Sequence, residues 1–469
     1  MAGDQSLMLP VVSGTEYETT RSATLAAING DALCEVPRTP RVSVHDAVAT
    51  ARDEGFEALQ AMPIRELLDR VATAGQLFLG EGAPAHGRFT DCSLFEQYQR
   101  RVVSATGLPA GWVRMSSHWL AFGLRHAAES LRAQSPTGNL QVYSEPAYTR
   151  ETDLGLAFAP RVRVLGAMMP SNDPAVYAWP ALALAMKIPI VLRPSDRDPI
   201  TAVRLGRALR SAGVPESAIH VLPGDRSIGE TVCREADHAM IFGTGETVAS
   251  FQADPSVETY GPGQSVAVLA RNPTNDELDT LARGITRAGG RACFCLTRII
   301  ATGKCNADSL ADQLAQRVTS IDGAECGSLL DERTGVPGFS PDTADRLDDS
   351  VTALSGRDVT AEYRGDRLLK QNSVARLRPT VLRTDDLVSE FPFQFAGVTE
   401  RDRDVLADLD SAYLAVVIGS NEIERTLVRS PEIKKVYGGR YPATVDLRET
   451  HETYLTSFLY HTTTYDSSQ

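Results

Sequence analysis

The feature that most constrains the fold of this chain is a regular alternation of apolar and amphipathic segments over residues 162–242. Short apolar runs rich in β-branched residues predict strands, and the longer segments between them predict helices. The strands are expected at 162–168, 189–193, 218–222 and 239–242, and the helices at 175–187, 202–212 and 227–235. Such a rhythm requires crossover connections and therefore a parallel sheet, an architecture that commonly binds nucleotides.

A second α/β block is expected after residue 260. Thr274 and Glu277 have the spacing of a capping box, which predicts the start of a helix running to about Arg287. The other expected elements are strands at 265–269, 297–301, 379–383 and 412–418 and a helix at 307–318.

The remaining segments are expected to be helical at the beginning and extended later. Apolar periodicity predicts helices near 43–59, 63–80, 93–106 and 117–133. Residues 140–161 are strand-like and are interpreted as a hairpin, and 454–465 predict an added strand of the kind that often serves subunit contact.

Composition and charge exclude several classes of protein. A net charge of −13 argues against nonspecific nucleic-acid binding. The apolar region 175–192 contains Lys187 and Pro189, so no membrane span is expected. The first residues lack the basic and apolar regions of a signal peptide, and seven cysteines without regular spacing fit a reducing cytoplasm. No Cys or His pair has the spacing of zinc ligands, so no metal site is expected.

Two polar residues suggest covalent chemistry at a carbonyl group. Cys293 lies in the glycine-led segment 290–298, and Asn172 lies 121 residues earlier, between two prolines. A thiol can attack a carbonyl carbon, and a carboxamide can stabilise the oxyanion that forms. Cys295 is interpreted as a packing residue, with a redox or resolving role as the alternative.

From about Leu140 onward, several ordered motifs resemble those of the aldehyde dehydrogenase superfamily, most of all its acyl-CoA reductase and CoA-acylating branch. Cys293 and Glu390 are separated by 97 residues, as is usual in that family. In the asparagine motif, Ser171 stands where the family has an aromatic residue. The matching segments are Pro170-Ser171-Asn172, Arg193-Pro194-Ser195-Asp196, Pro223-Gly224-Asp225, Phe242-Gly243-Thr244-Gly245-Glu246-Thr247, Glu390-Phe391-Pro392-Phe393 and Arg448-Glu449.

The resemblance implies an α/β fold with two Rossmann-like parallel-sheet domains and a small β element for oligomerisation. Residues 1–139 and 162–258 would form the NAD(P)-binding domain and 259–444 the catalytic thiol domain. The segments 140–161 and 445–469 would form the oligomerisation hairpin and the C-terminal strand of a homodimer or homotetramer.

The resemblance also assigns roles to single residues. Cys293 would be the nucleophile, and the Asn172 amide together with the Cys293 N–H would form the oxyanion hole. Glu449 would take part in proton relay. Residues expected to bind the cofactor, NADP(H) or NAD(H), are Arg193, Ser195, Asp196, Gly224, Thr244, Gly245 and Glu390. Arg193 and Arg197 favour a 2′-phosphate whereas Asp196 favours free ribose hydroxyls; the choice between the two cofactors stays open, with NADPH preferred.

One departure from the family directs the expected reaction. The family's general base is a glutamate 34 residues before the cysteine, and Thr259 occupies that position here. Glu258 is one residue away, and in an extended segment this offset points its side chain to the opposite face. A threonine hydroxyl cannot activate water near pH 7.

We therefore expect an NAD(P)H-dependent reductase of an activated acyl group, carried by CoA or an acyl carrier protein, that releases an aldehyde. Three alternatives remain open. The chain could be a conventional aldehyde dehydrogenase that uses Glu258 or Glu449 as base, an acyl-phosphate reductase, or a degenerate member of the family without activity.

Overall fold

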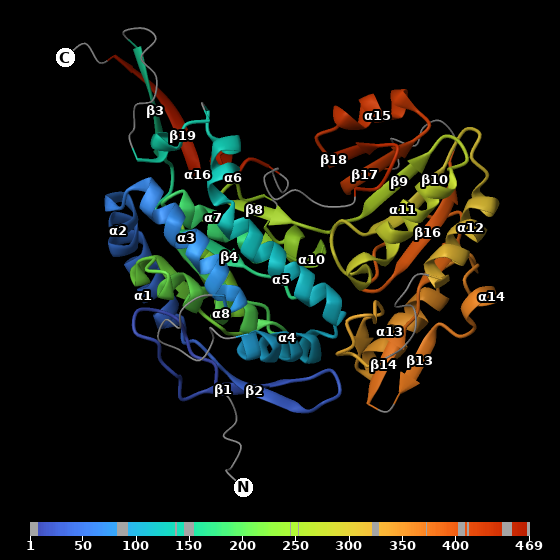
Figure 1. The fold of residues 1–469 in the computed structure, drawn as a ribbon, viewed down its shortest axis with the longest axis horizontal. Coiled ribbons are helices and arrows are strands. Elements are labelled where there is room, and N and C mark those ends of the chain that lie inside the picture. The colour runs from blue at the N-terminus through green and yellow to red at the C-terminus, as the bar shows by residue number, and fades with distance from the viewer. Residues whose placement is uncertain are drawn as a thin grey trace.

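The computed structural model describes residues 8–81, 92–144, 154–320, 328–401, 409, 412–442 and 453–466, except for the single positions 137, 244, 252 and 372. The fold is of the α/β class, and its two largest sheets lie in the two halves of the molecule (Figure 1). Among the described residues, no helix has both the length and the apolar character needed to cross a bilayer.

The first sheet is parallel and contains all the strands expected over 162–242. Its order is β6-β5-β4-β7-β8, so the chain starts in the centre and builds outward in both directions. Every residue of β4 and β5 is buried, which explains their continuous apolar character. The strands are β4 (Leu165–Met168), β5 (Ile190–Arg193), β6 (Ile219–Val221), β7 (His238–Phe242) and β8 (Val257–Tyr260).

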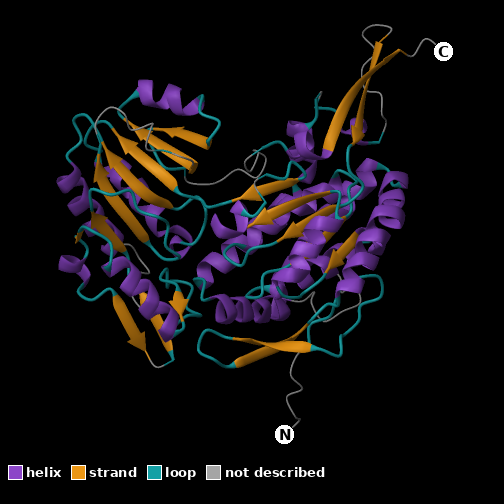
Figure 2. Cartoon of the chain, turned by 180° about the vertical axis from the view of Figure 1, so that it is seen from behind, coloured by secondary structure: helices purple, strands orange, loops and turns teal. Residues whose placement is uncertain are grey.

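Helices cover both faces of this sheet (Figure 2). Asp198 and Asp225 cap two of the crossover helices by accepting bonds from the backbone N–H groups of Thr201 and Ser227. The helices of this half are α1 (Arg41–Thr50), α2 (Phe56–Ala61), α3 (Ile64–Leu79), α4 (Cys92–Thr106), α5 (Ala110–Arg125), α6 (Ala127–Gln134), α7 (Ala178–Ala185), α8 (Pro199–Ser211), α9 (Arg226–Glu235) and α10 (Gly245–Ala249).

The second sheet has the order β12-β15-β16-β10-β9-β17-β18 and is parallel except for β12. The capping box of Thr274 and Glu277 is present at the start of α11, as the sequence predicts. The strands are β9 (Ser265–Leu269), β10 (Leu296–Ala301), β12 (Arg357–Asp358), β15 (Thr380–Arg383), β16 (Phe395–Glu400), β17 (Ala412–Ile418) and β18 (Ile433–Gly438). The helices are α11 (Asn275–Thr286), α12 (Ala307–Ser320), α13 (Pro341–Thr352), α14 (Ala361–Arg364) and α15 (Asn421–Val428).

Smaller antiparallel elements complete the fold. One lies beside the second sheet and has the order β11-β14-β13, formed by Gly338–Phe339, Val374–Leu377 and Leu368–Gln371. Near the N-terminus, β1 (Ser22–Ala26) and β2 (Ala32–Pro37) form a hairpin. The sequence predicted a mostly helical N-terminal region, and this hairpin was not predicted.

A two-stranded ribbon projects from the first half (Figure 1). It pairs β3 (Leu154–Pro160) with β19 (Tyr460–Asp466), which follows the short helix α16 (Leu455–Leu459). The expected hairpin over 140–161 needs correction, because Leu140–Tyr143 is a 3-10 turn and β3 takes its partner from the far end of the sequence. Residues 145–153 lie outside the described part.

Candidate active site

The turn that carries Cys293 is held between two glycines that leave no room for a side chain. A Cβ on Gly263 would lie 2.3 Å from the Cys293 carbonyl oxygen, and one on Gly290 would lie 2.2 Å from the Phe393 carbonyl oxygen. Gly290 also has a φ of 76°, which a residue with a side chain rarely adopts. Ser265, at the start of β9, donates to the Cys293 carbonyl at 2.7 Å. The turn is therefore fixed against the second sheet before β10 begins.

Cys293 is half-buried, whereas the other four free cysteines that the structure describes are buried. Burial raises the pKa of each of those four thiols. They are Cys34, with a pKa of about 11, Cys233 and Cys295, each with a pKa of about 12, and Cys305, with a pKa of about 11. Cys293 is thus the thiol in this part of the chain that solvent reaches most easily.

Asn172 approaches the same turn from the first half of the molecule. It follows β4, and its Nδ2 donates to the Arg291 carbonyl at 2.8 Å. A carboxamide has two N–H donors, so this bond leaves one for another acceptor. The structure therefore brings Asn172 and the Cys293 turn together, although the sequence separates them by 121 residues.

Glu390 lies against the base of the Cys293 turn. Its carboxylate accepts from the backbone N–H groups of Gly263 at 3.1 Å and Gln264 at 3.2 Å. The resemblance assigns this residue to a cofactor ribose. In the structure its carboxylate bonds to the backbone of Gly263, the glycine on which the Cys293 turn is packed, and the cofactor role stays a prediction.

Glu258 lies on β8, where its carboxyl group accepts a hydrogen bond from the Thr453 hydroxyl. Desolvation raises the pKa of Glu258, while the hydroxyls of Thr453 and Tyr260 and the charge of Lys434 act in the opposite direction. Thr259, the next residue, pairs with Ile241 of β7. Glu258, the acidic residue nearest in sequence to the position of the family's base, is thus bonded to Thr453, in the segment that precedes α16.

The predicted cofactor residues of the first sheet form a cluster at the end of β5. Arg193 donates to the Gly224 carbonyl at 2.8 and 3.1 Å and to Asp196 at 2.6 Å. Only 8% of the Arg193 side chain is exposed, against 68% for Asp196. Ser195 accepts from the backbone N–H of Arg197.

Other predicted residues lie beyond this cluster or outside the described part. Gly245 begins α10 after β7, and a Cβ placed there would meet nothing within 4 Å. Thr244 and Glu449 fall on positions that the structure does not describe.

Sequence reasoning missed a set of residues around Arg287, six positions before Cys293. The Arg287 guanidinium carbon lies 4.9 Å from the ring centre of Trp119, 5.3 Å from Phe294 and 5.9 Å from Trp112. The sequence does contain one indication of the aromatic part of this cluster: Trp112 and Trp119 are seven residues apart and so share one face of a helix.

Tyr441 joins Arg287 to the cysteine turn. Its hydroxyl donates to the Phe294 carbonyl at 3.2 Å and also forms a hydrogen bond with Arg287. Burial, and the neighbouring thiols of Cys295 and Cys293, raise the pKa of Tyr441.

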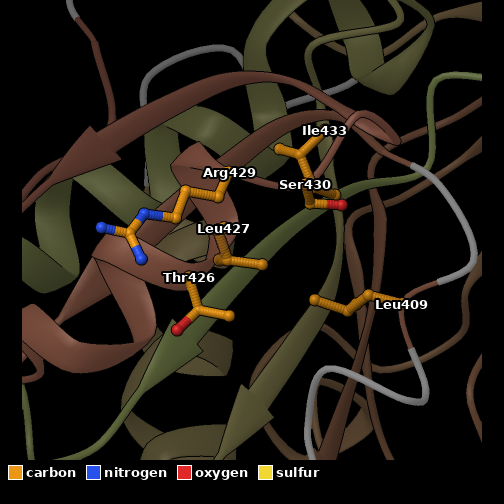
Figure 3. A pocket seen from close by; sticks show the side chains of 6 residues that line it. All are labelled: Leu409, Thr426, Leu427, Arg429, Ser430 and Ile433. Atoms are coloured by element: carbon orange, nitrogen blue, oxygen red, sulfur yellow. The ribbon is translucent and has the colours of Figure 1, made fainter.

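A separate cavity of about 310 Å³ lies between α15 and β18 (Figure 3). Its lining is mostly apolar and includes none of the residues that hold Cys293. It is therefore distinct from the candidate active site. The lining residues are Leu409, Thr426, Leu427, Arg429, Ser430 and Ile433.

Comparisons with curated proteins give relatives that include several dehydrogenases of aldehydes. Geranial dehydrogenase of Castellaniella defragrans is 28% identical over 342 residues, which make up 68% of this chain and 64% of that protein. Malonate-semialdehyde dehydrogenase 1 of Geobacillus thermodenitrificans is 23% identical over 336 residues, with the same two coverages. The matched region thus spans less than two thirds of each of these relatives.

Comparisons with solved structures and with family models extend the likeness. The aldehyde dehydrogenase KauB from Pseudomonas aeruginosa is 17% identical, with a TM-score of 0.76 over 98% of this chain and 97% of that one. An indole-3-acetaldehyde dehydrogenase in complex with NAD+ is 16% identical, with a TM-score of 0.76 over 98% and 96%. Because the sequence identities are this low, the structural similarities establish the fold and nothing beyond it. The model of the aldehyde dehydrogenase family matches residues 124–389, which is more than half of the sequence, so the chain belongs to the aldehyde dehydrogenase family of oxidoreductases.

Proposed function

We propose that this chain is an NAD(P)-dependent aldehyde dehydrogenase in which Cys293 forms a covalent bond with the substrate carbonyl carbon. The observation that carries the proposal is the meeting of a half-buried thiol with a carboxamide from the other sheet. Cys293 lies in a turn that two glycines fix, and Asn172 is bonded to that same turn at Arg291. A nucleophile and an oxyanion donor on separate rigid elements suit attack on a carbonyl.

The chain's own residues account for the first chemical step. The Cys293 thiolate adds to the aldehyde carbon, and the second N–H of the Asn172 amide donates to the oxygen as negative charge develops on it. The chemistry that a bound nicotinamide supplies is hydride acceptance, which leaves the acyl group on Cys293 as a thioester. Ser265 and Gly263 keep the turn in place during this exchange, because they fix its backbone.

The first sheet fits a dinucleotide. Its strand order reverses at β4, and in open parallel sheets ligands bind at the carboxyl ends of the strands where that reversal occurs. Asn172 follows β4 there, and Gly245 follows β7 with open space beside it. Asp196 compensates the charge of Arg193, which favours the free ribose hydroxyls of NAD over a 2′-phosphate. Initial rates with NAD+ and NADP+ test this preference.

Oxidation of an aldehyde to an acid is the favoured overall reaction, because the relatives are named for dehydrogenation of geranial and of malonate semialdehyde. Hydrolysis of the thioester needs a base. Glu258 is the candidate, since a carboxyl group whose pKa is raised is a better base near neutral pH.

A second candidate is transfer of the acyl group to or from a carrier thiol, the reaction of an acyl-CoA reductase or an acylating dehydrogenase. Thr259 occupies the position of the family's base, and the carboxyl groups of Glu258 and Glu390 already accept hydrogen bonds from the protein. A site without a poised base would protect the thioester from water. Loss of the acyl group to CoA would then compete with hydrolysis.

The deciding experiment incubates the protein with an aldehyde panel and NAD+ or NADP+, with and without CoA, and identifies the products by mass spectrometry. Acid formed without CoA supports the dehydrogenase, and Glu258→Gln should then lower its formation. Acyl-CoA formed only with CoA supports the second candidate, and Thr259→Glu should then produce some acid. Reduction of no nicotinamide under any condition would contradict both.

The β3–β19 ribbon is proposed as the contact between subunits. An isolated two-stranded ribbon is only marginally stable in water, so a projecting one gains from a partner. We propose a homodimer or homotetramer, and light scattering of a variant that lacks residues 460–466 tests it. If the variant forms an oligomer of the same number of subunits as the intact protein, this role is contradicted.

A further inference from the structure

Arg291, two residues before Cys293, bonds to the first half of the molecule through both its backbone and its side chain. Its backbone carbonyl accepts from the Asn172 amide at 2.8 Å. Its guanidinium Nη1 donates at 2.6 Å to the carbonyl of Thr106, the last residue of α4. One residue of the Cys293 turn thus connects the candidate oxyanion donor to the end of a helix in the opposite half.

The end of α4 is a suitable anchor for this guanidinium. Carbonyl groups in the last turn of a helix lack partners within the helix and lie at the negative end of its dipole. The Thr106 hydroxyl donates to the Val102 carbonyl at 2.7 Å, and the N–H of Gly338, on β11, donates to the Gly107 carbonyl at 2.8 Å. The Arg291 side chain therefore bonds to a helix end that other hydrogen bonds already fix.

The guanidinium is packed as well as bonded. Its central carbon lies 5.8 Å from the ring centre of Phe339, on β11. Burial lowers the pKa of Arg291 to about 10, and the charge of Arg197 acts in the same direction. This pKa still lies well above neutral pH, so the guanidinium stays charged. Its bond to Thr106 is therefore charge-assisted, which makes it stronger than a bond between neutral groups.

The backbone just before Arg291 requires contacts that hold it in place. Ala288 has a φ of 54°, in the left-handed region that a residue with a Cβ rarely adopts. Such a conformation persists only where the surrounding structure imposes it. The Arg291 N–H donates to the Ala288 carbonyl at 3.3 Å, so the strained residue and the anchored one belong to the same turn.

We propose that Arg291 is a positioning residue for the oxyanion donor. Its side chain fixes the turn to the end of α4, and its carbonyl then holds the Asn172 amide in register with Cys293. The inference rests on the proposed function, because it takes Cys293 as the nucleophile and Asn172 as the donor to the oxyanion. In this role Arg291 acts on the reaction through Asn172 and not by its own contact with the reacting atoms.

A double-mutant cycle tests the inference, with the most rapidly oxidised aldehyde of the panel as substrate. Arg291→Met removes the N–H donors and keeps an unbranched side chain, and it is compared alone and together with Asn172→Ala. Arg291→Lys keeps a charge, and it replaces the methionine variant in the cycle if that variant does not fold. Arg376→Met is the matched control, because Arg376, on β14, is also buried against a backbone carbonyl, that of Val336, to which it donates at 2.7 Å.

Arg291→Met should lower kcat by about 10- to 100-fold and change KM by less than about threefold, because a displaced oxyanion donor loses its effect mainly in the transition state. Added to Asn172→Ala, the same substitution should lower kcat by less than about threefold, because the group that it positions is already absent. Arg291→Lys should show a smaller loss of the same pattern. Arg376→Met should lower the Tm and change kcat by less than about twofold.

A crystal structure of the Arg291 variant separates this inference from the proposed function, because it needs no turnover. The Asn172 Nδ2 should lie beyond hydrogen-bond distance from the carbonyl of residue 291, whereas it lies at 2.8 Å in the unmodified protein. Iodoacetamide should still modify Cys293 in this variant, because Gly263 and Ser265 hold that part of the turn.

Three results would overturn the inference. Losses of kcat that multiply in the double variant would show that Arg291 and Asn172 act independently. A loss of kcat no larger than that of Arg376→Met, with a lower Tm, would leave Arg291 only a structural role. An unchanged bond from Asn172 to residue 291 in the crystal would show that the side chain does not set the position of the amide.

Failure of the proposed function gives a different pattern. Cys293→Ala and Asn172→Ala would then keep full turnover, while the crystal structure of the Arg291 variant would still show the displaced amide. In that case the contact of Arg291 with α4 positions Asn172 as inferred, and the chemistry assigned to Asn172 and Cys293 is wrong.

Discussion

Cys293 and Cys295 are two residues apart, yet the structure gives them opposite environments. Cys293 is half-buried in the turn, and its backbone contacts Gly263 and Ser265. Cys295 is buried, and its Sγ donates to the Arg287 carbonyl. Burial is the main cause that raises the pKa of Cys295 to about 12, and the carboxylates of Glu390 and Asp173 add to it.

The difference shows that position relative to the strand, and not the residue type, decides the chemistry. β10 begins at Leu296, so Cys295 already has the packing of the sheet, whereas Cys293 is still in the turn. A thiol must lose its proton to become a nucleophile, and at Cys295 the effect of burial on the pKa outweighs the opposite effect of the Arg287 charge. The comparison therefore predicts one reactive thiol and one packing thiol.

The largest expected effect comes from removing each sulfur in turn. Cys293→Ala should reduce turnover by at least about 10³-fold, because it removes the sulfur that would form the covalent intermediate. Cys295→Ala should keep turnover within a few-fold. Steady-state rates, with cofactor binding followed by fluorescence as the control for folding, measure both. Full activity of Cys293→Ala would contradict the assignment of Cys293 as the nucleophile.

Alkylation sharpens the same comparison without mutation. At pH 8 a thiol with a pKa of about 12 is ionised in roughly one molecule in 10⁴. Iodoacetamide should therefore modify Cys293 on the order of 10³-fold faster than Cys295. Because the Cys295 pKa lies so high, its modification should speed up about tenfold for each pH unit between 7 and 9. Peptide mapping after a timed reaction measures the rates, and equal labelling would show that the two environments are alike.

Replacement of Asn172 tests whether its amide takes part in catalysis or only packs against the Cys293 turn. Asn172→Ala should lower kcat on the order of 10²-fold with a smaller change in KM, because an oxyanion donor acts mainly in the transition state. Alkylation of Cys293 should continue in this variant. If kcat stays unchanged, the bond from Asn172 to Arg291 has only a structural role.

The smallest effect concerns stability. Cys295→Ala should lower the free energy of unfolding by about 1–2 kcal/mol, since it removes a buried sulfur and a bond to a carbonyl. Cys293→Ala should change it by less than about 0.5 kcal/mol, because the side chain is half-buried. Urea denaturation of both variants provides the measurement. A larger loss of unfolding free energy for Cys293→Ala than for Cys295→Ala would contradict the argument from burial.

The periodic parts of the fold could be predicted from the sequence. The strands β4 to β7 and their crossover helices, and the helix α11 with its capping box, follow from local patterns that the packing reinforces. The strand β18 was not predicted, because Lys434 and Lys435 interrupt its apolar character at the edge of the sheet. The partner of β3 was missed because local patterns cannot show that a strand pairs with a segment 300 residues away.

The candidate site was predictable in part. Cys293 and Asn172 stand out by residue type and by the motifs around them, and the structure brings them together. The contacts of Glu390 with Gly263 and of Arg193 with Gly224 depend on how the turns fold back, so the sequence could not reveal them. Arg287 belongs to no motif, and only the packing of α5 against the turn reveals its contacts with Trp112 and Trp119.

The antiparallel pairing of β3 with β19 has a consequence for synthesis on the ribosome. The first sheet can form once residue 260 has emerged, but β3 must wait until residues 460–466 are translated. Thr456 and the backbone N–H of Leu455 also bond to Gln134, at the end of α6. During that interval the unpaired edge of β3 is exposed, and a nascent chain would be most open to chaperones or to misassembly at this strand.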